Sequence, residues 1–353
     1  MNEMSNWLKL AVELKASDIF IGVGRCVSFK IGGVITKHSD VPVNIMEIET
    51  MIAELYSLAH RPMERYLETG DDDFSISLPG LARFRVSAYQ QRGTKAAIIR
   101  VVLFCLPDYH DLNIMDEVIS LASLRHGLAL VTGVAGSGKT TTLACIIDEI
   151  NRTRNGHIIT LEDPIEHLHR DNKSVISQRE ISTDTDSYLT ALRACMRQAP
   201  DVILLGELRD HETIRTAMTA AETGNLVIST LHTVGATNTI DRIIDVFPPN
   251  QQQQIRVQLS MVLRVVVSQQ LLPGISGGLL PAFEMMCQNN AIRNLIRESK
   301  IHQIDSVIQT SRADGMISMD TSIYNLYQQN KITAETAVHH SNDVQQMTKR
   351  LGL

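Results

Sequence analysis

Apolar and polar residues alternate over short runs through the first hundred positions, as in strands with one buried face. The alternation is clearest at 83–89, where Phe84, Val86 and Ala88 share one face. Further strands are expected at 18–22, 27–31, 71–78 and 96–104, and helical spacing predicts helices at 7–15 and 45–58. Residues 1–105 are therefore expected to form a small α+β domain on an antiparallel sheet.

The pattern changes after about residue 113, where wholly apolar runs begin to alternate with helical segments. Strands are expected at 128–132, 157–161, 202–205 and 226–230, and helices at 141–150, 188–197 and 212–222. Such alternation predicts a parallel sheet with helices on both faces. The segment 250–270 is interpreted as one helix and 279–286 as a last strand, and the chain from residue 290 onward is expected to be helical.

The strand at 128–132 leads directly into a glycine-rich motif, G-x-x-x-x-G-K-T, which runs from Gly133 to Thr140 and precedes a helix. Its glycines let successive N–H groups surround an anion at the helix N-terminus. Lys139 can reach the β- and γ-phosphates, and the Thr140 hydroxyl can hold Mg²⁺. We therefore expect a nucleotide and Mg²⁺ as ligands. The expected phosphate-binding set is Gly133, Gly136, Ser137, Gly138, Lys139, Thr140 and Thr141.

Polar residues follow each of the other buried strands, at the edge where parallel sheets bind ligands. Glu162, Asp163 and Glu166 could position the attacking water; a solvated acidic loop is the alternative. Glu207 follows strand 202–205 in a Walker B layout and would hold Mg²⁺ directly or through water. His232 follows the fourth of these strands, 226–230, and could hydrogen-bond a phosphate, although a lone histidine is more often structural.

Other charged residues have two interpretations. Arg83, Arg85 and Arg100 lie on expected strands of the first domain, where they fit either a solvated face or arginines donated to a neighbouring P-loop site. Asp210 precedes an expected helix and is interpreted as its N-cap. The residues alone do not choose between the two roles of the arginines.

The amino-acid composition disfavours several classes of protein. The net charge of −6 and the lack of a stretch that combines aromatic and basic residues disfavour direct nucleic-acid binding. Five scattered cysteines without a C-x-x-C pair indicate reduced, buried thiols rather than a zinc site or disulfides. The N-terminus lacks the pattern of a signal peptide, and the apolar runs are too short to span a membrane. We expect a soluble cytoplasmic protein, which could lie against a partner in a membrane.

These motifs in combination resemble the secretion ATPase superfamily of type II secretion and type IV pili. The resemblance covers nearly the whole chain. Beyond the P-loop it rests on 162–166, 177–180, 206–210, 221–224, 230–233 and 241–248. The segment 291–298, Ala-Ile-Arg-Asn-Leu-Ile-Arg-Glu, resembles the signature of the pilus retraction branch, the PilT-type motors. Some N-terminal residues also resemble the PilU-type paralogue, and Arg25-Cys26 and Asn225 depart from the family pattern.

The resemblance implies a PAS-like domain at 1–105, a linker at 106–114, a RecA-like core at 115–286 and a helical C-terminal region at 287–353. It also implies a homohexamer with ATP between subunits. The catalytic glutamate would be Glu166, supported by Glu162 and Asp163, with Glu207 in the Walker B position and His232 in the histidine box. The implied trans arginines are Arg85 and Arg100, with Arg83 as a secondary match.

The implied activity is ATP hydrolysis that drives pilus retraction through an inner-membrane platform protein. Segment 291–298 would link ring motion to work, although an amphipathic helix explains its apolar stripe equally well. The alternatives are an ATPase of type IVB secretion, conjugation or type II secretion, then a nucleic-acid translocase, and last a nucleotide sensor without enzymatic activity.

Overall fold

The computed structural model describes residues 3–102 and 106–353. The chain divides into two compact units: Met1–Leu106 with Glu166–His169, and Pro107–Ile165 with Arg170–Leu353. Each unit has its own hydrophobic core. Within the described ranges, none of the helices combines the length and apolar character needed to cross a membrane.

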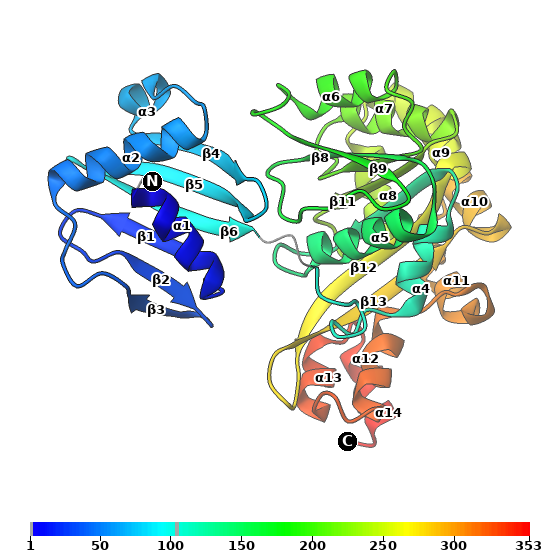
Figure 1. The fold of residues 1–353 in the computed structure, drawn as a ribbon. Coiled ribbons are helices and arrows are strands. Elements are labelled where there is room, and N and C mark those ends of the chain that lie inside the picture. Colours follow the sequence, from blue (N-terminus) through cyan, green and yellow to red (C-terminus); the bar gives the residue numbers. More distant parts are fainter. Residues whose placement is uncertain (1–2, 103–105) are drawn as a thin grey trace. The chain divides into compact units, whose positions relative to one another are not determined.

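The first unit is a six-stranded antiparallel sheet in the order β3-β2-β1-β6-β5-β4, with helices packed on one face (Figure 1). Its strands are β1 (Asp18–Gly22), β2 (Ser28–Ile31), β3 (Val34–Lys37), β4 (Asp71–Leu78), β5 (Ala82–Gln91) and β6 (Thr94–Val102), and its helices are α1 (Glu3–Glu13), α2 (Ile45–Leu58) and α3 (Glu64–Thr69). The expected α+β domain on an antiparallel sheet is confirmed.

The alternation in β5 is also confirmed. Phe84, Val86 and Ala88 are buried in the core of this unit, whereas Arg83 and Arg85 lie on the other face. Two elements of this unit, β3 and α3, were not expected from the sequence. Every residue of β3 is exposed, so its apolar residues produce no burial alternation, and α3 has only six residues. The strand expected at 96–104 is β6, and its last two expected positions lie outside the described residues.

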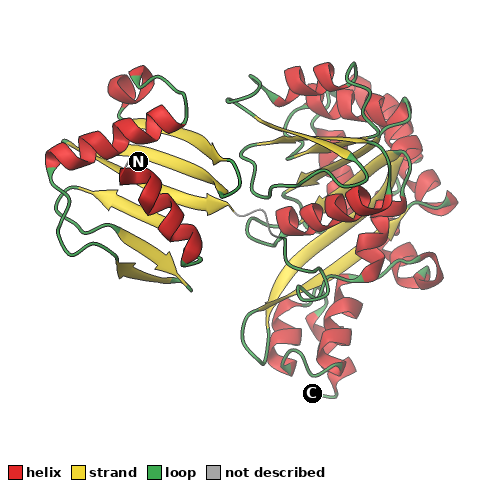
Figure 2. Cartoon of the chain, in the orientation of Figure 1, coloured by secondary structure: helices red, strands yellow, loops and turns green. Residues whose placement is uncertain are grey.

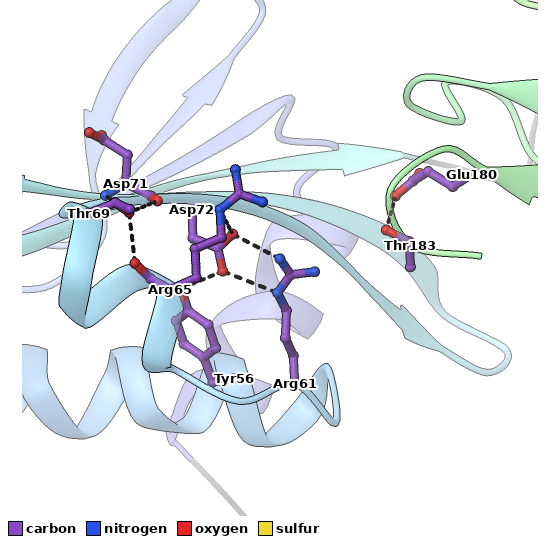
Figure 3. A network of polar contacts seen from close by, with 8 residues as sticks. All are labelled: Tyr56, Arg61, Arg65, Thr69, Asp71, Asp72, Glu180 and Thr183. Atoms are coloured by element: carbon purple, nitrogen blue, oxygen red, sulfur yellow. Dashed lines mark hydrogen bonds and ion pairs between the residues drawn. The ribbon is translucent and has the colours of Figure 1, made fainter. Parts of the chain in front are cut away.

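A buried carboxylate joins α2, the loop that follows it and β4 (Figure 3). Asp72 accepts hydrogen bonds from the Tyr56 hydroxyl at 3.1 Å and from Arg61 Nε and Nη2 at 3.1 and 2.9 Å. A buried charge is tolerated only when it is paired and hydrogen-bonded. Burial and the charge of Asp72 both raise the pKa of Tyr56, so the phenol remains protonated and donates.

The second unit is built on a seven-stranded sheet in the order β13-β12-β7-β11-β10-β8-β9, covered by helices on both faces (Figure 2). Only the pairing of β12 with β13 is antiparallel. The strands are β7 (Gly127–Thr132), β8 (His157–Glu162), β9 (Val175–Glu180), β10 (Val202–Leu205), β11 (Leu226–Leu231), β12 (Leu263–Pro273) and β13 (Leu279–Cys287).

Two hydrophobic cores fill the two faces of this sheet. Leu128 and Leu130 of β7 pack with residues of α6 (Tyr188–Cys195), α7 (His211–Glu222), α8 (Ala236–Asp245) and α9 (Pro249–Val262). Ala129 and Val131 pack on the other face, with α4 (Asp116–Ile119), η1 (Ser120–Ser123) and α5 (Lys139–Thr153). Because successive strand residues point to opposite faces, burial of both faces explains why β7 is apolar throughout. The expected RecA-like α/β class is confirmed.

One expected element is wrong. The segment 250–270 was interpreted as a single helix, but α9 ends at Val262 and β12 begins at Leu263. The apolar run at the junction contains Val265, Val266 and Val267, and β-branched residues favour strands. Strand β12 pairs with β7 on one side and with β13 on the other, so most of this part of the strand is buried.

The chain after residue 290 is largely helical, as expected. Its elements are α10 (Asn290–Arg297), η2 (Ile301–Gln303), α11 (Ile304–Thr310), η3 (Arg312–Asp314), α12 (Met319–Gln328), α13 (Ala334–His340) and α14 (Val344–Leu351). The last three helices form a small core of their own with Leu272 and Ala282, near the turn of the β12–β13 hairpin (Figure 1).

Candidate active site

The glycine-rich loop joins β7 to α5, and it requires glycine for two reasons, backbone conformation and space. Gly133, Gly136 and Gly138 have φ of +142°, +77° and +85°, which side-chain-bearing residues rarely adopt. A Cβ on Gly133 would also lie 2.2 Å from the Gln269 carbonyl oxygen. Space and conformation therefore both require glycine at position 133, whereas only conformation requires it at position 136, where the surroundings are open.

Lys139 is folded back onto this loop. It is 7% exposed, and its Nζ donates hydrogen bonds to the carbonyls of Gly133 and Val134, both at 2.8 Å. Burial lowers the pKa of Lys139, and the charge of Glu207 opposes this shift. An ammonium group has three donors, so one remains for a ligand.

The remaining phosphate-binding candidates fit an anion. Ser137 is buried, and its Oγ has no hydrogen-bond partner within the described residues. A buried hydroxyl without a partner is costly, and a phosphate oxygen would satisfy it. Thr140 and Thr141 lie in the first turn of α5, where the helix dipole favours an anion and where the Thr140 hydroxyl would hold Mg²⁺. The residues present therefore fit a Mg²⁺–nucleotide.

Gln269, on β12, packs against the glycine-rich loop. It is 3% exposed, and its Oε1 accepts a hydrogen bond from the Thr142 hydroxyl at 2.8 Å. A Cβ on Gly138 would lie 2.9 Å from Gln269 Nε2. Gln269 was not expected at the site because the segment 250–270 was interpreted as a helix; the run of valines before Gln269 is the signal for a strand.

The strand order brings most of the expected polar residues to one edge of the sheet. Strand β7, which leads into the P-loop, pairs with β11, β11 with β10, and β10 with β8, all in parallel. Their carboxyl ends carry, in that order, Lys139, His232, Glu207 and Glu162. These residues thus follow neighbouring strands at the edge where parallel sheets bind ligands.

Glu207 and His232 are close together. His232 Nε2 lies 3.5 Å from Glu207 Oε2, and Arg209 forms an ion pair with the other carboxylate oxygen. The side chain of His232 is 59% exposed, whereas that of Glu207 is only 18% exposed. The His232 imidazole is therefore accessible to a ligand, and it faces the Glu207 carboxylate, which is also paired with Arg209.

Glu162 ends β8 and is buried. Its Oε1 accepts hydrogen bonds from the Thr160 hydroxyl at 2.6 Å and from Gln178 Nε2 at 3.2 Å. Glu180, at the end of the neighbouring strand β9, accepts from the Ile165 amide at 3.1 Å and from the Thr183 hydroxyl at 3.3 Å (Figure 3). The start of the acidic segment is thus fixed to β9, a strand that the sequence analysis did not predict.

Of the other candidate residues, Glu166, Arg83, Arg85 and Arg100 belong to the first unit, whereas Asp163 is exposed and lies in the second. Glu166 is also exposed. Arg85 and Arg100 are direct partners across β5 and β6, and Arg100 Nε donates to Asp18 Oδ1 at 3.0 Å. Within the second unit the structure brings together the P-loop, Glu162, Glu207 and His232; within the first it pairs the two arginines.

Asp210 has the expected structural role. It is the N-cap of α7, where its carboxylate accepts hydrogen bonds from the Thr213 amide at 2.8 Å and the Thr213 hydroxyl at 2.7 Å. Burial alone would raise the pKa of Asp210, but these hydrogen bonds outweigh it and the pKa is lowered. Helix capping therefore explains the role of the Asp210 carboxylate.

Comparison with known proteins gives consistent results. The family model described as type II/IV secretion system protein matches residues 2–350. The chain is 40% identical over 336 residues to the type IV pilus retractation ATPase PilT of Pseudomonas aeruginosa, covering 95% of this chain and 97% of that protein. It is 44% identical over 303 residues to a twitching motility protein of Neisseria gonorrhoeae, covering 86% and 80%.

The fold agrees with that of a solved relative. The crystal structure of the pilus retraction motor PilT with bound ADP superposes with a TM-score of 0.89 at 43% identity, covering 99% of each chain. The nucleotide named for that structure matches the ligand class that the P-loop here fits.

Proposed function

This chain belongs to the type II/IV secretion system protein family, and we propose that it is the ATP-hydrolysing motor that retracts type IV pili. The observation that carries the proposal is a P-loop with Lys139 bonded to its backbone, in a chain similar over nearly its whole length to a retraction motor with bound ADP. The relatives described above are named for pilus retraction or twitching motility. Those names favour retraction over the secretion, conjugation and nucleic-acid alternatives.

Different residues of the second unit are assigned to the phosphates and to Mg²⁺. The P-loop amides, Lys139 and Ser137 would bind the phosphates, and Thr140 and Glu207 would hold Mg²⁺. Mg²⁺, when bound, neutralises phosphate charge and orients the phosphates. His232 contacts the nucleotide phosphate from the end of β11, where it is exposed beside Glu207.

Two acidic residues position the attacking water in this account. Glu166 is the principal carboxylate, and Glu162 supports it from the end of β8. The charge that develops during hydrolysis is stabilised by Arg85 and Arg100 of a neighbouring subunit. Their direct pairing across β5 and β6 supports a shared role, because it concentrates two guanidinium groups at one position of the sheet.

A site that includes arginines of a neighbouring subunit forms only when the subunits assemble. We infer a homohexamer in which domain 1–105 of one subunit moves against core 115–286 of the next, through the linker at 106–114. The ring acts at the cytoplasmic face of the inner membrane on a platform protein of the pilus, and segment 291–298 links the motion of the ring to this work. An isolated monomer binds ATP but hydrolyses it poorly.

The direct biochemical test compares purified wild type with Lys139→Ala. Loss of the ammonium group removes the principal charge from the phosphate cradle, so ATP hydrolysis should fall to background. Exposed Lys173→Ala is the matched control and should hydrolyse ATP like wild type. An active Lys139→Ala protein would refute the site assignment.

A further inference from the structure

Helix α8 begins just after the strand end that carries His232. Only Thr233, Val234 and Gly235 separate His232 from Ala236, the first residue of this helix. Gly235 is the N-cap, with φ of +84° and ψ of 151°, a conformation that is in effect restricted to glycine. Helix α8 therefore has no N-cap side chain of its own, and the amides at its start require acceptors from other parts of the fold.

Two buried side chains of the β12–β13 hairpin are these acceptors. The Ser268 hydroxyl, on β12, accepts a hydrogen bond from the Gly235 amide at 2.9 Å, and Glu284 Oε1, on β13, accepts one from the Ala236 amide at 2.8 Å. Both side chains are buried. A buried amide that loses its acceptor is costly, because water does not replace the lost partner. The hairpin thus fixes where α8 begins.

The loop between His232 and α8 is bonded as well. The Thr239 hydroxyl, which is fully buried, donates to the Gly235 carbonyl at 2.7 Å. A hydroxyl has a single proton to donate, so the Thr233 hydroxyl is the donor in its 2.7 Å contact with the Thr239 hydroxyl. The backbone that follows His232 is therefore tied to the first turns of α8, and through Gly235 and Ala236 to the hairpin.

We propose that Glu284 and Ser268 are positioning residues for ATP hydrolysis, which hold the start of α8 so that His232 faces the nucleotide phosphate. The inference rests on the proposed ATPase function. The side chain of His232 is 59% exposed, so its placement depends on the backbone on either side of it. On the side of β11, the Thr230 hydroxyl donates to the Gly206 carbonyl at 2.6 Å. On the side of α8, the bonds to Ser268 and Glu284 have the same role.

The test measures kcat for ATP hydrolysis in variants that remove one acceptor each. Glu284→Ala and Ser268→Ala should each lower kcat about 10-fold, because a misplaced group near the reacting atoms can cost up to about 100-fold. Glu284→Gln keeps an acceptor for the Ala236 amide and should retain a kcat close to that of wild type. If both residues act through His232, neither alanine substitution should lower kcat further in a His232→Ala background.

Ser322→Ala is the matched control for a purely structural effect. The buried Ser322 hydroxyl accepts a hydrogen bond from the Phe283 amide at 3.0 Å, so this variant loses a bond of the same kind on β13 without affecting the start of α8. It should lower the thermal unfolding midpoint and leave kcat unchanged. If Glu284→Ala does not fold, the smaller change in Ser268→Ala decides the outcome.

Three results would overturn the inference. They are a wild-type kcat in the folded alanine variants, a wild-type kcat in His232→Ala, and a further loss of kcat when either alanine substitution is added to His232→Ala. In each case wild type still hydrolyses ATP, so the proposed function stands. Wild type that does not hydrolyse ATP would instead refute the proposed function, and with it the inference.

Discussion

The hydroxyl of Thr142 donates a 2.8 Å hydrogen bond to the side-chain carbonyl of Gln269, a residue 127 positions further along the chain. Both residues are buried. This bond joins the helix that follows the P-loop to β12, and the backbone carbonyl of Gln269 also limits the space at Gly133. The shape of the phosphate cradle therefore depends on a strand outside the motif.

Gln269→Ala should destabilise this support. It leaves the buried Thr142 hydroxyl without its acceptor, which costs about 1–3 kcal/mol. Urea unfolding measures the stability, and titration with ATP measures the expected loss of affinity. Gln270→Ala is the matched control, because Gln270 instead donates to the His340 carbonyl at 3.2 Å. Wild-type stability and affinity in Gln269→Ala would contradict the supporting role.

Two glycines of the loop should respond differently to alanine. Gly133→Ala should abolish ATP binding, because its Cβ would lie 2.2 Å from a backbone oxygen. Gly136→Ala meets open space and should cost only the left-handed conformation, about 1–2 kcal/mol. Equilibrium binding of a fluorescent ATP analogue to both folded variants distinguishes them. Equal losses of affinity would show that backbone conformation alone determines the loop.

Glu284 should give stability a distinctive pH dependence. It is 7% exposed on β13 and accepts a hydrogen bond from the Ala236 amide at 2.8 Å, at the start of α8. Burial raises the pKa of Glu284 above 4.5, although the Ala236 hydrogen bond opposes the shift. The folded state therefore holds this proton more tightly than the unfolded state, and its contribution to stability falls as the pH rises from 4.5 through the raised pKa.

Glu284→Gln should remove that contribution while keeping an acceptor for the Ala236 amide. The free energy of unfolding of wild type, relative to the variant, should decrease as the pH rises through this window. Chemical denaturation at a series of pH values measures the difference. Parallel curves for the two proteins would contradict a raised pKa at Glu284.

Substitutions on helix α10 should abolish pilus retraction without reducing ATP hydrolysis. Ile292 and Ile296 are buried against the core, so packing accounts for the apolar stripe of this helix but not for Arg293 and Arg297. The double variant Arg293→Ala, Arg297→Ala should keep ATPase activity and lose pilus retraction in cells. Lys300→Ala, an exposed neighbour, should retain both activities. A double variant that retracts pili normally would exclude the coupling role.

Local patterns were sufficient to predict much of this fold. The P-loop, its flanking strand and helix, and the alternation of β5 depend on residues close in sequence. Strand β12 was missed because the apolar spacing that indicated α9 continued into a run buried on both faces, which has no strand periodicity. Gln269 was missed because the segment 250–270 was interpreted as a helix, and because its partner Thr142 lies 127 positions away along the chain. The pairing of Arg85 with Arg100 likewise depends on strand register, which neither segment reveals alone.

The central claim is that ATP hydrolysis by this protein drives pilus retraction. The most direct measurement is the retraction of fluorescently labelled type IV pili on living cells that lack the protein and are complemented with wild type or with Lys139→Ala. We predict that deletion stops retraction, that wild type restores it, and that Lys139→Ala does not although it is produced at the same level. Normal retraction in the deletion strain, or restoration by Lys139→Ala, would contradict the account.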